Sequence, residues 1–249
     1  MKVFIDGKPC EAEYGEYILD VAKRNGIHIP TLCHSDALSG IGSCRLCIVE
    51  VVEGSRRMVV TSCLYPITRE IEVFTSTEKI KKMRKTIIML LSSRVPQNDY
   101  IKRLREEYGV KPTSRFKGDN NEQCILCGLC VKACEAIGTN AIAAVNRGIT
   151  KKISTPYDEV SEDCIGCGAC AQVCPTGAIG MYQEEGKRTI WGRTFELLKC
   201  EQCGKYYATR EQLKHSIDKL DGKKEMLCDR CKKKAVAASF KTIYEDMNL

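Results

Sequence analysis

All but one of the 17 cysteines in this chain of 249 residues fall into four groups of four, and every group contains neighbours separated by two residues. Thiolates at that spacing converge on a metal centre, whereas the cysteines of a disulfide framework are scattered so that they tie distant segments together. The chemistry available to these residues is therefore metal binding, with iron–sulfur clusters and zinc as the centres to be weighed. The residue left over is Cys10, which we expect to be a small buried side chain in a strand.

The first group has the pattern C-x10-C-x2-C-x15-C and predicts a plant-type [2Fe–2S] centre. Its members are Cys33, Cys44, Cys47 and Cys63. Such a centre needs two thiolates on each iron, and the small residues between the first two cysteines allow the backbone to wrap around the inorganic sulfides. The alternative is a zinc site, which the long first spacer disfavours. His34 follows a ligand, but a Rieske centre needs two histidines on one iron, so we expect His34 to be a loop residue.

The second and third groups repeat the spacing C-x2-C-x2-C-x3-C, and Pro175 follows the last cysteine. This is the pattern of bacterial ferredoxins with two [4Fe–4S] clusters, in which the fourth cysteine of each group ligates the other cluster. We therefore expect the first cluster to be held by Cys124, Cys127, Cys130 and Cys174. The second cluster is expected on Cys134, Cys164, Cys167 and Cys170.

The last group consists of two C-x2-C pairs, and its members are Cys200, Cys203, Cys228 and Cys231. Four thiolates in this arrangement suit a tetrahedral structural Zn²⁺. A third [4Fe–4S] cluster is the alternative, and the two differ in function because zinc is redox-inert whereas a cluster extends an electron path. The pattern favours zinc and leaves the alternative open. Between the pairs, Thr209 and Gln212 predict a capping box at the start of a helix.

The elements that must position these groups predict an α+β protein. Alternating apolar residues predict short strands in the first 76 residues, and a helix around residues 18–22 completes a small β-grasp sheet. The parts that we expect are a [2Fe–2S] domain at 1–76, a helical connector at 77–120, a dicluster ferredoxin domain at 121–185 and a four-cysteine metal-knuckle domain at 186–249.

The connector is basic, with twelve Lys and Arg residues against five Asp and Glu. Its first helix has a predicted apolar face made of Ile80, Met83, Ile87, Leu90 and Leu91. The opposite face carries Lys81, Lys82, Arg84 and Lys85, which we expect to be solvated. The alternative is that this basic face docks an acidic partner such as a ferredoxin. A second helix is expected to begin at Asn98 or Asp99.

Composition excludes several classes of protein. The formal net charge is +7, but a fully cysteine-ligated centre carries a charge of about −2, so four centres offset that excess and nucleic-acid binding is not expected. No stretch approaches the roughly 18 apolar residues of a membrane span. The opening residues reach Asp6 and Gly7 too soon for a signal peptide. We therefore expect a cytoplasmic protein, since thiols stay reduced there.

Two motifs bring a family into view: residues 29–34, which read IPTLCH, and residues 42–51, which read GSCRLCIVEV. They resemble the iron–sulfur subunits of NADH dehydrogenases and of NAD(P)-linked hydrogenases, including flavin-based electron-bifurcating ones. The resemblance covers about residues 1–185. It implies a hetero-oligomer with a flavoprotein subunit that carries FMN and oxidises NAD(P)H, and with a catalytic subunit such as a hydrogenase small subunit. One departure is plain: the related subunits place a His-and-three-Cys cluster after the first long helix, and residues 64–123 here contain neither residue type.

The chain shows no catalytic equipment of its own, because it has no dinucleotide fingerprint, no P-loop and no acid–base or nucleophile constellation. The sequence therefore predicts an electron-transfer subunit that relays single electrons between a flavin subunit and a hydrogenase. Two alternative functions require the same clusters but different partner proteins. The chain could serve a formate dehydrogenase or a ferredoxin:NAD(P) transhydrogenase, or it could be a free-standing polyferredoxin.

Overall fold

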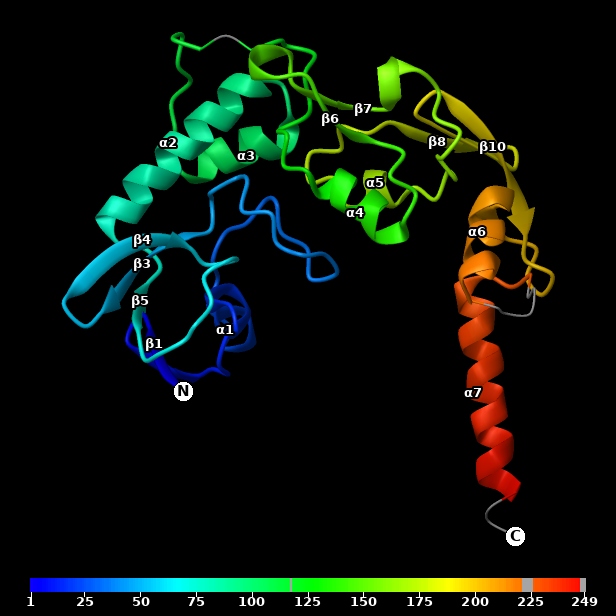
Figure 1. Ribbon diagram of the computed structural model, residues 1–249, viewed down its shortest axis with the longest axis horizontal. Helices are drawn as coiled ribbons and strands as arrows, with labels where there is room; N and C mark the ends of the chain where they lie inside the picture. Colours follow the sequence, from blue (N-terminus) through cyan, green and yellow to red (C-terminus); the bar gives the residue numbers. More distant parts are fainter. Residues whose placement is uncertain (117, 221–225, 247–249) are drawn as a thin grey trace.

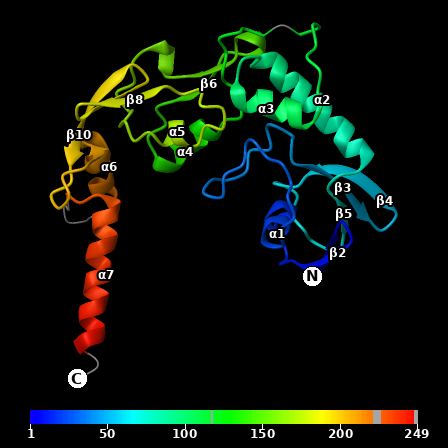
Figure 2. The same ribbon diagram turned by 180° about the vertical axis from the view of Figure 1, so that it is seen from behind.

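A computed structural model describes residues 1–116, 118–220 and 226–246 of the chain. These residues form an arch (Figures 1 and 2). The N-terminal sheet stands at one foot, the long C-terminal helix forms the other, and the two ferredoxin-like repeats lie at the crown between them.

The N-terminal part is a five-stranded sheet in the order β2-β1-β5-β3-β4. Its elements are β1 (Lys2–Ile5), β2 (Lys8–Glu11), α1 (Ile18–Arg24), β3 (Ile48–Glu53), β4 (Arg56–Thr61) and β5 (Glu72–Phe74). Strands β1 and β5 pair in parallel and the other neighbours are antiparallel. The predicted β-grasp arrangement is therefore confirmed.

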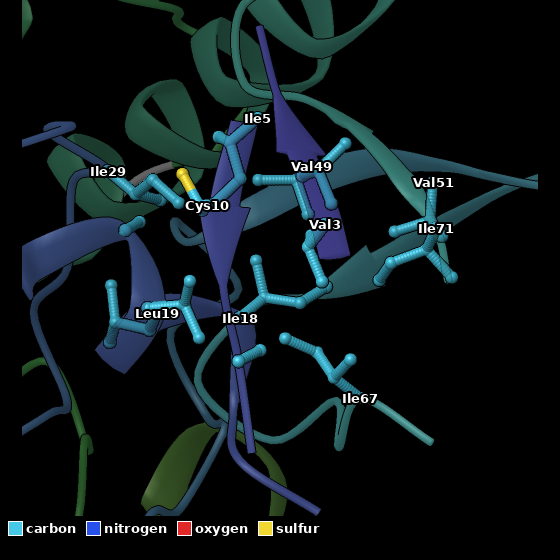
Figure 3. Packing of buried hydrophobic residues seen from close by; sticks show 14 of the residues in the cluster. Val3, Ile5, Cys10, Ile18, Leu19, Ile29, Val49, Val51, Ile67 and Ile71 are labelled. Carbon is cyan, nitrogen blue, oxygen red and sulfur yellow. The ribbon is translucent and has the colours of Figure 1, made fainter. Parts of the chain in front are cut away.

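Alternation explains this core. Val3 and Ile5 of β1 point to the same face of the sheet, where α1 covers them with Ile18 and Leu19 (Figure 3). Cys10 lies in the same cluster and is only 3 % exposed, as expected for a small buried side chain. This packing fixes the sheet from which the first cysteine loop emerges.

The connector consists of α2 (Glu78–Arg94) and α3 (Asp99–Glu107), which pack against each other. Thr77 and Asn98 cap them, each accepting a hydrogen bond from a backbone N–H three residues on. The expectation that Arg84 lies on the solvated face is wrong. Arg84 is 5 % exposed, whereas Met83 and Leu90 of the predicted apolar face are 39 % and 47 % exposed. The buried stripe follows Ile80, Arg84 and Ile88 because the cysteine loop supplies carbonyl partners for the guanidinium.

The two ferredoxin-like repeats each begin a helix at a left-handed glycine. Gly128 precedes α4 (Leu129–Ile137) and Gly168 precedes α5 (Ala169–Gln172), and both glycines have positive φ. A hairpin of β6 (Ala143–Val145) and β7 (Lys152–Ser154) separates the repeats. Short 3-10 turns at Gly148–Thr150 and Pro156–Asp158 complete this insertion.

The C-terminal part begins with a four-stranded sheet in the order β11-β10-β9-β8. Its elements are β8 (Met181–Glu184), β9 (Lys187–Ile190), β10 (Arg193–Lys199), β11 (Tyr206–Thr209), α6 (Arg210–Leu220) and α7 (Asp229–Asp246). Residue 185 lies in the turn between β8 and β9, so this sheet spans the expected domain boundary. The Thr209 hydroxyl accepts a hydrogen bond from the Gln212 N–H at 3.0 Å, and this contact caps α6. No helix in the described ranges is long and apolar enough to cross a membrane.

Candidate metal centres

The N-terminal cysteines are all buried and form two pairs. Cys33 and Cys44 lie in the loop that follows α1. The Cys44 N–H donates a hydrogen bond to the Cys33 Sγ at 3.3 Å. Cys47 and Cys63 form the second pair, with their Sγ atoms 3.2 Å apart. Within each pair one thiol donates to the other, and this hydrogen bond lowers the pKa of Cys44 to about 6 and that of Cys47 to about 7. Two thiol pairs match the need of a [2Fe–2S] centre for two ligands on each iron.

Arg84 ties this cysteine loop to the connector. Its Nε donates to the Leu46 carbonyl at 3.1 Å and its Nη2 to the Ile48 carbonyl at 2.7 Å, on either side of Cys47. Burial lowers the pKa of the guanidinium, but backbone carbonyls satisfy its donors. Arg84 therefore places a positive charge beside the thiolates while it holds their loop.

Four cysteines line one cavity at the crown of the arch: Cys124, Cys127, Cys130 and Cys174. The first three come from the loop before α4 and its first turn, and the fourth comes from the end of the other repeat. Backbone N–H groups already face the sulfurs. Leu126 donates to the Cys124 Sγ at 3.4 Å and Ala178 donates to the Cys174 Sγ at 3.3 Å.

A second cavity is lined by three cysteines of the second repeat and the fourth cysteine of the first repeat: Cys134, Cys164, Cys167 and Cys170. Here the Ala141 N–H donates to the Cys134 Sγ at 3.2 Å, and the Thr139 hydroxyl lies 3.1 Å from the same sulfur. Thr176 stands at the same place beside Cys174 in the other cavity, at 3.6 Å. The fourth cysteine of each repeat thus faces the other repeat's cavity, which is the arrangement that the spacing predicts.

Burial controls the protonation of these thiols. Desolvation raises the pKa of Cys127 to about 11, that of Cys130 to about 12 and that of Cys170 to about 11. These three thiols are therefore protonated at neutral pH until a cation compensates the thiolate charge. Loading either cavity with metal must release protons.

The N-terminal centre and the first cavity are neighbours. The Ser43 hydroxyl donates to the Leu126 carbonyl at 3.4 Å, and a Cβ added at Gly128 would lie 3.6 Å from the Ile41 Cδ1. Cys44 and Cys127 belong to one apolar cluster. The cysteine sites therefore follow one another along the arch, with apolar packing between the first two.

The C-terminal cysteines form a much tighter group. The four Sγ atoms of Cys200, Cys203, Cys228 and Cys231 all lie within 4.8 Å of one another. Four ligands at about 2.3 Å from a tetrahedral zinc lie about 3.8 Å apart, and the Cys203 and Cys228 sulfurs are 3.7 Å apart. Backbone N–H donors, with that of Cys228 first, lower the pKa of Cys200 to about 6. Within residues 1–116, 118–220 and 226–246, no other three candidate ligands meet that separation.

Comparison with known proteins agrees with these sites. A model of the 2Fe-2S iron-sulfur cluster binding domain matches residues 1–78. A model of the 4Fe-4S dicluster domain matches residues 123–178 and again residues 163–208. Among solved structures, the chain aligns with a chain of NAD⁺-reducing [NiFe]-hydrogenase in the H₂-reduced state, with a TM-score of 0.60 and 26 % identity. That alignment covers 71 % of this chain and 85 % of the other.

Curated relatives point the same way. NADP-reducing hydrogenase subunit HndD of Solidesulfovibrio fructosivorans is 33 % identical over 72 % of this chain and 36 % of its own length. NADPH-Fe(3+) oxidoreductase subunit alpha of Geobacter sulfurreducens is 36 % identical, over 80 % and 26 %. The NADH-ubiquinone oxidoreductase 75 kDa subunit of Reclinomonas americana is 29 % identical, over 72 % and 29 %.

The chain is similar to part of an NADP-reducing hydrogenase subunit and to part of the NADH-ubiquinone oxidoreductase 75 kDa subunit. The resemblance drawn from the two cysteine motifs is thereby confirmed. The chain spans about a quarter to about a third of the length of the curated relatives that it matches. The match therefore concerns the iron–sulfur region of those larger proteins.

Sequence reasoning missed the arginines that hold the cysteine loops. Arg84 is one of four whose guanidinium donates to carbonyls of cysteine loops. Arg94 Nε donates to the Cys124 carbonyl at 2.7 Å, Arg188 Nη1 to the Gly166 carbonyl at 2.8 Å, and Arg193 Nη1 to the Cys164 carbonyl at 2.9 Å. No local pattern marks these residues, because their partners come from segments 22 to 38 positions away in the chain.

Proposed function

We propose that this chain passes single electrons between a flavoprotein subunit that oxidises NAD(P)H and a hydrogenase-like catalytic subunit. The observation that carries the proposal is the succession of three cysteine sites along the arch, with apolar contact between the first two. When bound, iron–sulfur clusters accept and donate one electron at a time. The names of the relatives supply the two ends of the path, since HndD is a subunit of an NADP-reducing hydrogenase.

The ligand sets that we propose follow the cavities. Cys33, Cys44, Cys47 and Cys63 would hold a [2Fe–2S] cluster, and each of the two crown cavities would hold a [4Fe–4S] cluster. The donor sets fit these groups, because each offers four thiols and backbone N–H donors aimed at sulfur. The protein's own contribution is to bury the thiols and to orient those donors. The domain limits at 76, 120 and 185 remain part of this proposal.

For the C-terminal site we propose a single Zn²⁺ with a structural role. The spacing of its sulfurs supports zinc over a third [4Fe–4S] cluster, because in a cubane an iron stands between each thiolate and the centre and so spreads the ligands further apart. Among the described residues, the four sulfurs of each crown cavity do not all lie within 4.8 Å of one another. One observation favours the alternative: the second dicluster match extends over Cys200 and Cys203.

Metal and sulfide analysis of the anaerobically purified protein tests both proposals. We expect about ten irons and one zinc per chain, the sum of one [2Fe–2S] and two [4Fe–4S] clusters with a single ion. About fourteen irons without zinc would replace the zinc proposal by a third cubane. A protein without iron after anaerobic reconstitution would refute the electron-transfer function.

Cross-ligation has its own test. We expect Cys134→Ser to damage the cluster of the second cavity and to leave that of the first cavity intact, as followed by EPR of the reduced protein. Cys174→Ser is the matched variant, with the opposite expectation. Loss of the first cluster in Cys134→Ser would refute the assignment.

The proposed partners are a subunit carrying FMN and a catalytic subunit, in a hetero-oligomer placed in the cytoplasm, where thiols remain reduced. In a flavin-based bifurcating complex, the chain would carry one of the two electrons leaving the flavin. A formate dehydrogenase or transhydrogenase would use the same path with another terminus. Affinity purification from the native host separates these cases, and recovery of the chain alone would favour a free polyferredoxin.

A further inference from the structure

Trp191, the single tryptophan of the chain, stands between the two crown cavities. It lines the cavity that contains Cys124 and also the one that contains Cys164. Its indole Nε1 donates to the Sγ of Cys170 at 3.5 Å, within the range of a hydrogen bond to sulfur. In the part of the chain that the structure describes, no other side-chain N–H donates a hydrogen bond to the sulfur of a crown cysteine.

The backbone of Trp191 is held in an unfavourable conformation. Trp191 and Gly192 form the two-residue turn between β9 and β10, and their φ angles are +52° and +72°. Such a turn has positive φ at both positions and strongly prefers Asn-Gly or Gly-Gly. A bulky aromatic residue at positive φ is an outlier, and strain of this kind gathers at functional sites. The turn itself does not require a tryptophan, since it would form more readily with asparagine.

Neighbouring contacts keep the turn in place beside the second cavity. Arg193 Nη1 donates to the carbonyls of Glu162 and Cys164, at 2.8 and 2.9 Å. The guanidinium of Arg193 also lies over the ring of Phe195, 4.8 Å from its centroid, and Phe195 is only 1 % exposed. The strand that follows Trp191 is thereby fixed to the loop that carries Cys164. The turn that carries the indole is therefore held beside the second cavity.

We propose that Trp191 is a positioning residue that sets the reduction potential of the cluster in the second cavity through its N–H···S hydrogen bond. A donor to a ligating sulfur stabilises the reduced, more negative cluster and raises its potential. The indole ring also lines both cavities. Any water that the ring excludes would otherwise stabilise the more negative reduced cluster, so this effect of the ring opposes that of the N–H donor. The inference rests on the proposed function, because it requires clusters in both cavities.

The decisive variant is Trp191→Phe, which keeps an aromatic ring and removes only the N–H. We expect a negative shift of the midpoint potential of the second cluster, measured by EPR-monitored redox titration, and a smaller shift of the first. Trp191→Asn is the matched control for structure. Asparagine suits the turn, so the protein should become no less stable to urea. Its potential shift should be less negative than that of Trp191→Phe, because loss of the ring also admits water. A purely structural tryptophan predicts the reverse, with lower stability and unchanged potentials.

A second measurement does not depend on any variant. Protein made with ¹⁵N-indole tryptophan carries the label at one position only, so pulsed EPR of the reduced clusters should show ¹⁵N coupling. Absence of that coupling, or unchanged potentials in Trp191→Phe with both clusters present, overturns the inference and leaves the electron path intact. Wild-type protein that binds no [4Fe–4S] clusters would instead refute the proposed function.

Discussion

Gly166 allows a test of packing beside the second cavity. Two separate features disfavour a larger residue there: its left-handed backbone and the close approach of the Phe195 ring. It lies two residues after Cys164 with φ at +64°, in the left-handed region. A Cβ added there would lie 2.6 Å from the Cδ2 of Phe195 and 2.7 Å from its Cγ. Phe195 is buried and held under Arg193, so its ring has no space into which to retreat.

Gly177 is the matched control, because its φ is also +64° and nothing lies within 4 Å of its added Cβ. Both alanine variants should lose about 1 kcal/mol to the left-handed backbone. Gly166→Ala should lose a further ~2 kcal/mol because it overpacks a close-packed site. The difference between the two variants therefore isolates the clash with the Phe195 ring.

The assay is urea denaturation of the loaded protein under anaerobic conditions, followed by far-UV circular dichroism and by the visible absorption of the clusters. If cluster loss makes unfolding irreversible, the rate of bleaching at fixed urea ranks the variants instead. Phe195→Leu combined with Gly166→Ala should recover part of the loss, as coupled neighbours do. Equal destabilisation of the two glycine variants, to within about 0.5 kcal/mol, would refute the packing argument.

Three further predictions follow from buried polar contacts and from the C-terminal site. Arg84→Gln keeps a donor beside the cysteine loop but removes the positive charge, so the potential of the [2Fe–2S] centre should fall in a redox titration; an unchanged potential would contradict this role. Asn98→Ala removes a helix cap and leaves the Thr176 carbonyl, 2.8 Å from the amide, without that donor, and should reduce the free energy of unfolding by about 2 kcal/mol in urea titrations. Cys203→Ser should release zinc at lower chelator concentration and leave iron content unchanged, whereas Cys10→Ser should change neither metal in elemental analysis.

Cysteine spacing is a local property, and the crown cysteines that it groups line common cavities in the structure. Cys124, Cys127 and Cys130 must share a site once a tight turn is given, and the duplicated spacing places the fourth ligand across the repeats. The strands of the N-terminal sheet were predictable for a similar reason, since alternation records which side faces the core. The separation of the four C-terminal sulfurs was not accessible, because it depends on how β11 and α7 bring two distant C-x2-C pairs together.

The expectation for Arg84 was wrong for a different reason, which also hides the place of Trp191. The charged side chains of a helix rich in lysine and arginine normally face water. No residue near Arg84 in the sequence indicates that the carbonyls of Leu46 and Ile48 will accept hydrogen bonds from its guanidinium. The place of Trp191 could not be predicted, because its sequence neighbours do not reveal that the turn faces Cys170. Both side chains satisfy polar partners made available only by tertiary structure.

The arginine contacts also fix the orientation of peptide units in the cysteine loops. In a trans peptide the carbonyl and the following N–H point in opposite directions. When Arg84 engages the Leu46 carbonyl from outside, the N–H of Cys47 must face the other way, into the ligand loop. Arg188 on the Gly166 carbonyl and Arg94 on the Cys124 carbonyl hold the corresponding peptide units at the crown cavities. A guanidinium that touches no ligand sulfur can thus hold the backbone of a ligand loop. Arg84 does so from α2 and Arg188 from β9, and Arg94 does so from the end of α2, where it also pairs with Glu122.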